Sequence, residues 1–363
     1  MEMQRRDLFK LMGLGLSGLG LSRFASPAFA QQSPRPAQSV PGALRFEREK
    51  GRAGPFGWPL DEVRIPFRER KGKVKFPNNA KLAVRVYITT EWDSGATNYD
   101  SLQEPDHKAV GPNLAWDRAN LYQLSFSGQY TFTVGVYRAM EMTDKYGIVG
   151  SVAADGGAVA AFPDLHGELH KKGWEIMARN WDHHYSPWTY KPGDEQVAEL
   201  KRVNDAIKQV TGANAYGWLS AGGNGSASWM KLLADSGFLY TTDLMGDDIP
   251  YGLKFGDKML VAIPHRQYSC NDFHNFLRTG GISARTVNMA YDYFCETFTH
   301  FYETVENQGW PVTMLYGIHP YWSCWPDRIK FHVKAMAFMK GFKDVWFVRH
   351  NDLAKYWKDT YLS

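Results

Sequence analysis

The clearest indication of the fold is the stretch Leu82-Ala-Val-Arg-Val-Tyr-Ile-Thr-Thr90, which is followed at once by Glu91-Trp92-Asp93. A run rich in β-branched and aromatic residues is typical of a buried strand, and the polar residues directly after it mark the strand's carboxyl end. In barrels and open sheets of parallel strands, the carboxyl ends gather at one face, where catalytic sites are built. Glu91 is therefore predicted to lie at such a face.

Two later stretches repeat this arrangement. Trp174–Ala178 precedes Arg179-Asn180-Trp181-Asp182-His183-His184, and Val312–Ile318 precedes His319-Pro320. If all three strands are parallel, residues far apart in the sequence meet at one edge. An acid, a histidine pair and a further histidine brought together in this way predict a hydrolytic site.

Strand-like and helix-like segments alternate from residue 80 to the end of the chain. Expected strands lie near 149–153, 174–178, 215–219, 239–242, 258–263, 312–318 and 345–348, expected helices near 136–147, 163–172, 194–210, 226–236, 282–308 and 328–340, and a final helix closes the chain. Residues 92–131 are expected to form a long loop. The alternation predicts an α/β fold with parallel crossovers, and the number of units favours a barrel over an open sheet.

The first residues look like an export signal. A twin-arginine pattern, Arg5-Arg6-Asp7-Leu8-Phe9-Lys10, precedes the apolar run Leu11–Leu21 and the small-residue cleavage pattern Ala28-Phe29-Ala30. The run is shorter than the roughly 20 apolar residues of a membrane span, and a buried N-terminal helix is the alternative. We predict a signal peptide over 1–30, a periplasmic protein, an extended arm rich in Pro, Gly and Arg over 31–79, and one domain over 80–363.

Charge and cysteine content say little about partners. Cleavage after residue 30 removes four basic and two acidic side chains, so the net charge of +4 falls to +2. That value gives no reason to expect a nucleic acid or an anionic membrane as partner, and no membrane anchor is expected after cleavage. Cys270, Cys295 and Cys324 have no CxxC spacing and predict neither a disulfide framework nor a structural zinc site.

Several short motifs occur in an order that resembles a known family. They include Phe162-Pro-Asp-Leu165, Gly217-Trp-Leu-Ser220, Leu232–Tyr240, Asp243–Tyr251 and His319-Pro320. Together they are similar to the polysaccharide deacetylase (NodB-homology) superfamily, in particular its branch with metal-independent allantoinases, cyclic imide hydrolases and some peptidoglycan deacetylases. The resemblance implies an α/β fold, a distorted and incomplete (β/α) barrel of the polysaccharide deacetylase type, and reactions that cleave C–N bonds of amides.

The resemblance also implies roles for individual residues. Glu91 falls at the general base, Asp93 at a metal-binding carboxylate, His183 at the second metal-binding histidine and His319 at the acid. Arg179 stands where the family has its first metal-binding histidine, and a guanidinium cannot ligate a cation. A divalent, Zn²⁺-like metal is therefore left open, with an incomplete ligand set. Without a metal, Arg179 is expected to stabilise a developing oxyanion.

Structural readings of the same residues stay open beside these roles. Glu91 could form a salt bridge to Arg179, and this would not exclude catalysis. The His183-His184 pair could form a hydrogen-bonded structural cluster.

Five further positions are expected to contact substrate, with packing in the core or at the rim as the alternative for each: Trp218, Ser220, Asp247, Asp248 and Trp322. The function predicted from all these observations is an exported hydrolase of non-peptide C–N bonds, acting on a small amide or imide or on an N-acetylated glycan. A non-catalytic descendant that binds a carbohydrate or small amide is the alternative, and a homo-oligomer is compatible with either.

Overall fold

The protein was analysed as a computed structural model, which describes residues 60–92, 124–183, 187, 190–223, 225–265, 272, 276 and 286–362. The chain divides into two compact units, Met1–Glu49 and Lys50–Ser363. Every described residue belongs to the second unit. The predicted signal peptide, Asp93, His184 and Cys270 lie outside the described residues.

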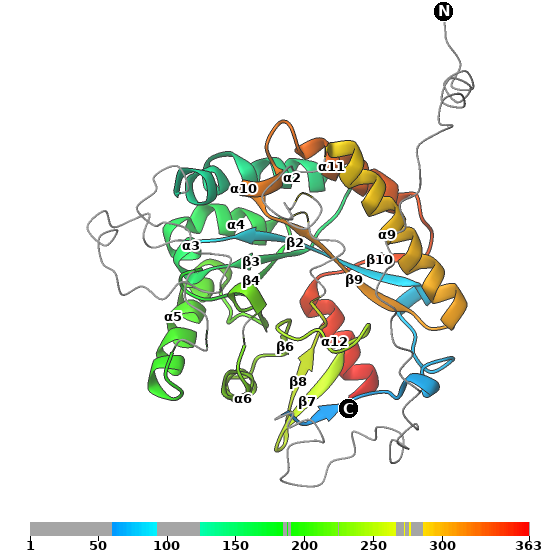
Figure 1. The fold of residues 1–363 in the computed structure, drawn as a ribbon. Helices are drawn as coiled ribbons and strands as arrows, with labels where there is room; N and C mark the ends of the chain where they lie inside the picture. The colour runs from blue at the N-terminus through cyan, green and yellow to red at the C-terminus, as the bar shows by residue number, and fades with distance from the viewer. Residues whose placement is uncertain are drawn as a thin grey trace, which may run out of the picture. The chain divides into compact units, whose positions relative to one another are not determined.

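One sheet runs through the second unit (Figure 1). Its strands are β1 (Glu62–Val63), β2 (Leu82–Thr90), β3 (Ser151–Ala154), β4 (Glu175–Ala178), β5 (Gly217–Trp218), β6 (Tyr240–Thr241), β7 (Tyr251–Phe255), β8 (Lys258–Ala262), β9 (Val312–Ile318) and β10 (Val345–Phe347). Their order is β1-β7-β8-β6-β5-β4-β3-β2-β10, and β9 also pairs with β2. The sheet does not close among the described residues, which confirms the predicted incomplete barrel.

Strand β2 is the centre of this arrangement. All nine of its residues are buried, and it pairs in parallel with β9 along most of its length, with β10 near its start and with β3 near its end. A strand with covered faces reads as a near-continuous apolar run, which explains the sequence of Leu82–Thr90.

The expected helices are present to within a few residues, while α3, α10 and the helical turns at 124–135 were not predicted. They are α2 (Val136–Lys145), α3 (Gly156–Ala161), α4 (Pro163–Lys171), α5 (Asp194–Thr211), α6 (Ala227–Asp235), α9 (Val287–Gln308), α10 (Pro320–Ser323), α11 (Ile329–Lys340) and α12 (His350–Tyr361). In Figure 1, α3, α4 and α5 lie along β3 and β4, while α9 and α11 pack together beside β9. Residues 124–129 (η5) and 131–135 (η6) are helical, so the expected loop over 92–131 ends earlier than predicted.

The sheet also departs from the prediction at β7. Strands β7 and β8 form an antiparallel hairpin through Gly256, which has φ of +66°, and β1 adds a further antiparallel pair to β7. A tight turn of this kind needs a positive φ, which glycine adopts without steric cost. The sequence analysis assigned Tyr251 to an acidic turn and therefore missed the hairpin.

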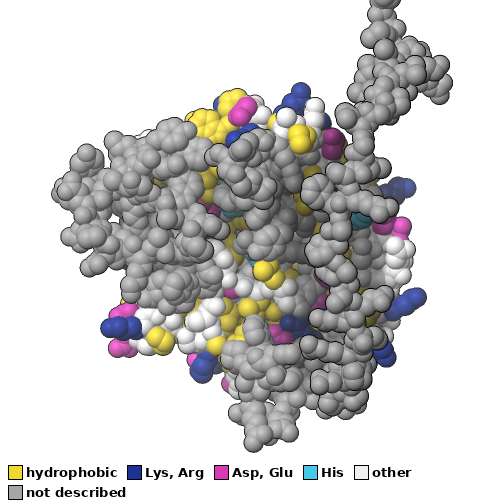
Figure 2. All heavy atoms as spheres, in the orientation of Figure 1, with side chains coloured by type: hydrophobic (Ala, Val, Ile, Leu, Met, Phe, Trp, Pro, Cys, Tyr) yellow, Lys and Arg dark blue, Asp and Glu magenta, His cyan; other side chains and the backbone are white. Residues whose placement is uncertain are grey.

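The distribution of surface charge and the character of the helices concern two expected absences, a nucleic-acid partner and a membrane anchor. On the part of the face that Figure 2 draws in colour, basic and acidic side chains are interspersed. Among the described residues, none of the helices has the length and apolar character that crossing a membrane requires.

Candidate active site

Four polar residues each directly follow a strand of the sheet. Glu91 follows β2, Asp155 follows β3, Arg179 follows β4 and His319 follows β9. The register aligns Thr90 with Ala154 and Ala154 with Ala178, and it places Ile88 opposite Ile318. The parallel strands therefore bring these four side chains to one edge, as the strand-end rule requires.

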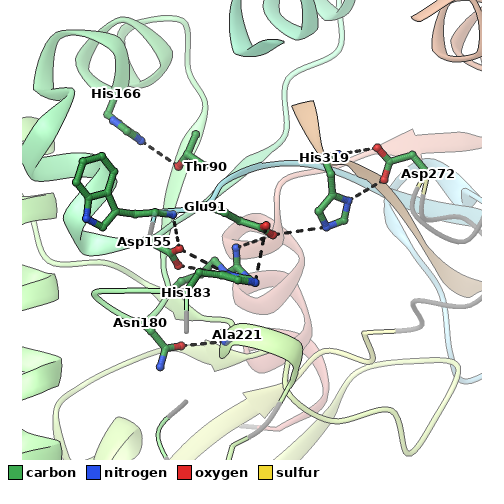
Figure 3. Close-up of polar contacts among 11 residues, drawn as sticks. Thr90, Glu91, Asp155, His166, Asn180, His183, Ala221, Asp272 and His319 are labelled. Carbon is green, nitrogen blue, oxygen red and sulfur yellow. Dashed lines mark hydrogen bonds and ion pairs between the residues drawn. The ribbon is translucent and has the colours of Figure 1, made fainter. Parts of the chain in front are cut away.

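Glu91 lies at the centre of the cluster (Figure 3). Arg179 Nη1 donates to its Oε1 at 3.2 Å, while His319 Nε2 lies 3.7 Å from Oε1 and His183 Nε2 lies 3.7 Å from Oε2. Burial alone would raise the pKa of Glu91, but the charges of His183, Arg179 and His319 and a hydrogen bond from Tyr321 lower that pKa to about 2. The carboxylate is therefore ionised at any physiological pH.

His183 is oriented by Arg179. Arg179 Nη2 donates to His183 Nδ1 at 3.1 Å, so in neutral His183 the proton is on Nε2, the nitrogen that faces Glu91. The exposed fraction of the side chain is 16% for His183 and 4% for Arg179. His183 is therefore partly open to solvent, while Arg179 is buried behind it.

Asp155 was not predicted, although it follows a strand in the same way. It is fully buried, accepts from the Trp92 backbone N–H at 2.8 Å, and lies 3.7 Å from both Arg179 Nε and His183 Nδ1. Burial raises its pKa, against the effect of Arg179 and His183. A Cβ at Gly157 would lie 2.2 Å from the Trp92 side chain, so glycine at this position lets Trp92 approach Asp155.

His319 is held by a second buried carboxylate, Asp272, which the sequence analysis also missed. Asp272 accepts from His319 Nδ1 and from the His319 backbone N–H, both at 2.7 Å (Figure 3). Burial opposes the charged form of His319, but Asp272 and Glu91 outweigh it and raise the pKa of the imidazole. Burial likewise opposes the charged form of Asp272, and its contacts with His319 lower the pKa of Asp272.

A chain of buried hydrogen bonds continues behind Asp272. Ser323 Oγ donates to Asp272, His332 Nε2 lies 2.7 Å from Ser323 Oγ, and Tyr316 OH lies 2.7 Å from His332 Nδ1. Burial lowers the pKa of His332 to about 4, so its ring is neutral. Because the Ser323 hydrogen points to Asp272, His332 donates through Nε2 and accepts the Tyr316 hydroxyl at Nδ1. Each hydrogen bond from Tyr316 to Asp272 therefore has a defined donor and a defined acceptor.

The described residues at this edge do not fit a divalent metal, while Asp93, the predicted metal-binding carboxylate, lies outside the described residues. The guanidinium of Arg179 already lies between Glu91, Asp155 and His183, the groups that would have to ligate a cation. Within the described ranges, no group of three or more His, Cys, Asp or Glu side chains is arranged to hold a metal ion. A metal would have to displace a buried, ion-paired arginine.

Trp218 and Ser220 lie in the core rather than in a pocket wall. Both are fully buried, Trp218 Nε1 donates to Ser220 Oγ at 2.8 Å, and Ser220 donates through N and Oγ to Asp243 at 2.6 Å. Their prediction as substrate-binding residues is wrong for this conformation, because no part of either side chain is open to a ligand.

Asp247 and Asp248 lie away from the site. Asp247 accepts from Arg64 at 2.9 Å and from Arg70 at 2.6 and 2.8 Å, and the Asp248 carbonyl accepts from Thr313 N. Thr313 is at the start of β9, whereas His319 follows its end. Asp247 therefore anchors the segment that carries the two arginines, which agrees with the packing alternative given for it. The substrate contact predicted for Asp248 stays a prediction, and Asp248 lines a hollow of about 400 Å³ together with α9 residues.

Trp322 lies in the turn after His319. Its backbone N–H donates to the His319 carbonyl at 2.8 Å, and Arg328 stacks over its ring at 4.9 Å. A hollow of about 490 Å³ lies beside this turn, lined by Ser125, Gln129, Tyr130, Thr133, Trp325, Asp327 and Arg328. The Tyr130 and Trp325 rings stack there at 3.6 Å. Trp322, which was expected to contact substrate, does not line this hollow, whereas Trp325 does.

Comparisons with known proteins agree with this architecture. Residues 124–241 match the family model for polysaccharide deacetylase. An allantoinase, PuuE, is similar in structure with 21% identity and a TM-score of 0.67, covering 79% of this chain and 94% of its own. A candidate polysaccharide deacetylase from Mycobacterium smegmatis has 22% identity and a TM-score of 0.65, covering 80% and 95% of the two chains.

A third similar structure, a candidate polysaccharide deacetylase from Pseudomonas aeruginosa PAO1, has 19% identity and a TM-score of 0.62, covering 79% and 94%. A search of curated proteins found no match. At these identities the structures establish the fold alone, while the family model establishes the relationship in sequence. Over residues 124–241 the chain is similar in sequence to the polysaccharide deacetylase (NodB-homology) superfamily, and its fold is similar to that of the three structures.

Proposed function

We propose that the protein is a hydrolase of C–N bonds other than peptide bonds. The observation that supports this most is the position of Glu91, 3.7 Å from an imidazole nitrogen of both His183 and His319 at the carboxyl edge of the sheet. A base, an acid and a donor of this kind are what amide hydrolysis needs. The names of the similar structures, an allantoinase and candidate polysaccharide deacetylases, favour a small or cyclic amide or an N-acetylated glycan as substrate.

Glu91 is the general base in this proposal. It is ionised, as a base must be, but a pKa of about 2 means that its proton affinity is low in the resting site. The low value comes from the surrounding positive charge. When negative charge develops on the substrate oxygen, that oxygen competes for the same positive groups, and the proton affinity of Glu91 rises as it takes the proton of the attacking water.

His319 is the general acid. Asp272 holds its Nδ1–H, so the Nε2–H of the protonated ring faces Glu91 and the space above it. Asp272 and Glu91 raise the pKa of His319, which favours the protonated ring that an acid needs. Transfer of the Nε2 proton to the leaving nitrogen completes cleavage of the C–N bond.

His183 is the electrostatic donor to the developing oxyanion. Its Nε2–H is the accessible donor, and Arg179, bonded to Nδ1, polarises it from behind. Arg179 is thus a positioning residue that acts through His183, which refines the direct oxyanion role predicted from the sequence. The roles proposed for Glu91, His319 and His183 use no metal, because Arg179 supplies the fixed positive charge.

The test is turnover of a panel of linear amides, cyclic amides and imides, and N-acetylated oligosaccharides by protein purified without chelators, repeated after dialysis against a chelator. We expect hydrolysis of one class, unchanged by the chelator. Activity lost with the chelator and restored by Zn²⁺ would contradict the role of Arg179. Binding without turnover of any member would favour the non-catalytic alternative.

The pH dependence of kcat/KM follows from the ionisation of Glu91 and His319. Glu91 is ionised above its pKa of about 2 and sets no acid limb in the working range. His319 must be protonated, and its pKa is raised above the ordinary value of 6.5. We therefore expect a plateau at and below pH 6.5 and a fall as pH rises through the raised pKa of His319.

Ser323→Ala tests the chain behind Asp272. It removes a donor that stabilises the charge on Asp272, so this carboxylate becomes a stronger acceptor for the His319 imidazolium and the alkaline limb moves to higher pH. It also leaves His332 Nε2–H without its acceptor. Ser151→Ala is the matched control, because Ser151 is also a buried serine between a carboxylate and a histidine, Glu175 and His350. A limb that stays in place in Ser323→Ala, or moves equally in Ser151→Ala, would contradict the assignment.

Export to the periplasm is proposed from the twin-arginine pattern of residues 5–10 and the cleavage pattern at 28–30. Changing Arg5 and Arg6 to Lys is expected to leave the protein in the cytoplasm with its signal uncleaved. Undiminished periplasmic protein with an N-terminus near Gln31 would overturn the route.

A further inference from the structure

Arg85 is a buried arginine in the middle of β2. It is 1% exposed and lies on the same face of the strand as Tyr87 and Thr89, since side chains alternate along a strand. Nη2 donates to the Pro264 carbonyl at 2.7 Å. Nε and Nη1 are buried and have no hydrogen-bond acceptor among the described residues. Most of the guanidinium's donor capacity is therefore unused.

The charge of Arg85 is also unbalanced. No carboxylate among the described residues forms an ion pair with it, and its surroundings lower its pKa to about 9, first through burial, against smaller effects of Tyr240 and Tyr87. The guanidinium stays charged at neutral pH. Glu175, beyond Tyr240, does not compensate this charge, because it accepts from Ser151 Oγ, Tyr240 OH and the Asn351 backbone N–H.

Two buried histidines on which the charge of Arg85 acts also have a ring nitrogen without a hydrogen-bond partner among the described residues, Nδ1 of His265 and Nε2 of His350. The Tyr87 ring is 5.5 Å from His265 and 6.4 Å from His350, and the charge of Arg85 acts on both histidines. Burial, first, and this charge lower the pKa of both rings, so neither adds a second cation.

We propose that the interior of the incomplete barrel binds a halide-sized monovalent anion, chloride under physiological conditions, through Nε and Nη1 of Arg85. Water could satisfy these donors but could not balance the charge, and an uncompensated buried charge costs several kcal/mol. Neutral His265 can add a donor to the shell of the anion through Nδ1, whereas neutral His350 cannot donate through Nε2, because its Nδ1–H donates to Ser151 Oγ. Tyr87, whose ring is 6.1 Å from that of His319, separates this interior site from the active site.

The test is the thermal unfolding midpoint of the full protein in increasing NaCl or NaBr, compared with sodium gluconate at equal ionic strength. We expect a saturable rise of a few degrees with halide only, because a ligand that binds the folded state alone raises Tm. Arg85→Met should lose the halide-dependent part. Arg68→Met, the same change at an exposed arginine, should keep it.

If Arg85→Met fails to fold, crystals of the wild-type protein grown or soaked in NaBr decide the question. A bromide anomalous signal within hydrogen-bond distance of Arg85 Nε or Nη1 supports the proposal. Density at that position without bromide signal identifies water and overturns it. A Tm that follows ionic strength equally in all three salts also overturns it. Neither result depends on the proposed hydrolase activity.

Discussion

Glu91→Gln is expected to lower kcat by about 10²–10⁴, the usual loss when a general base is removed. The amide keeps the shape of the side chain but cannot accept the proton of water. It also loses the charge that faces Arg179, His183 and His319. The measurement is kcat on the substrate identified from the panel, with substrate binding measured in parallel by calorimetry.

Two controls separate lost chemistry from lost structure. The unfolding midpoint shows whether the variant remains folded once the buried charge is gone, and Glu91→Asp keeps the carboxylate while withdrawing it by one methylene. Glu91→Asp should retain more activity than Glu91→Gln. A Glu91→Gln protein with nearly full kcat would remove Glu91 from the role of base.

Arg179→His is expected to lower metal-free kcat by about 10²–10³, the usual effect of losing one oxyanion-stabilising group. The variant takes away the charge that polarises His183. It also recreates the histidine spacing of the metal-binding family members, so affinity for Zn²⁺ should rise. Calorimetric titration with Zn²⁺, and activity with and without the metal, measure the two effects.

Arg68→His is the matched control, because it introduces a histidine at an exposed arginine far in sequence from the site. It should change neither activity nor Zn²⁺ affinity. If Arg179→His also changes neither, Arg179 has only a structural role and His183 is an oxyanion donor without its help. If Zn²⁺ restores full activity to Arg179→His, the arginine of the native protein supplies the positive charge that the metal supplies in the variant. The two proteins would then reach the same activity by different mechanisms.

The convergence of Glu91, Arg179, His183 and His319 could be predicted because it depends on one physical rule, that residues after parallel strands meet at one edge. The rule also covers Asp155, and a strand was expected near 149–153, just before it. The Asp-Gly-Gly that follows this strand looks like a turn, so Asp155 was not recognised as a site residue.

Asp272 could not be found in the same way. It lies in a stretch without strand or helix periodicity, and its role is defined by contacts with His319 and Ser323, about fifty positions later. Asp247 failed for a related reason, since its partners Arg64 and Arg70 lie 183 and 177 positions earlier. Long-range pairing of charges leaves no local pattern in a single sequence.

Trp218 and Ser220 show a different limit. A Gly-Trp-x-Ser segment at a strand end suggests a polar rim, but Ser220 spends both its N–H and its hydroxyl on Asp243. Whether a polar side chain faces a ligand or a buried partner depends on what lies across from it. The sequence shows the donor but not the acceptor.

The position of Arg179 has a consequence for how an active molecule is made. A metal site is filled from outside, so the fraction of competent protein depends on the supply of the ion and on competition from other proteins. A guanidinium is made with the chain, in a ratio of one to one, and takes its place as soon as the sheet forms. If the protein acts without a metal as proposed, it needs no loading step, and a chelator in its surroundings does not inactivate it. In return, the single positive charge of the arginine cannot be replaced by the double charge of a divalent ion.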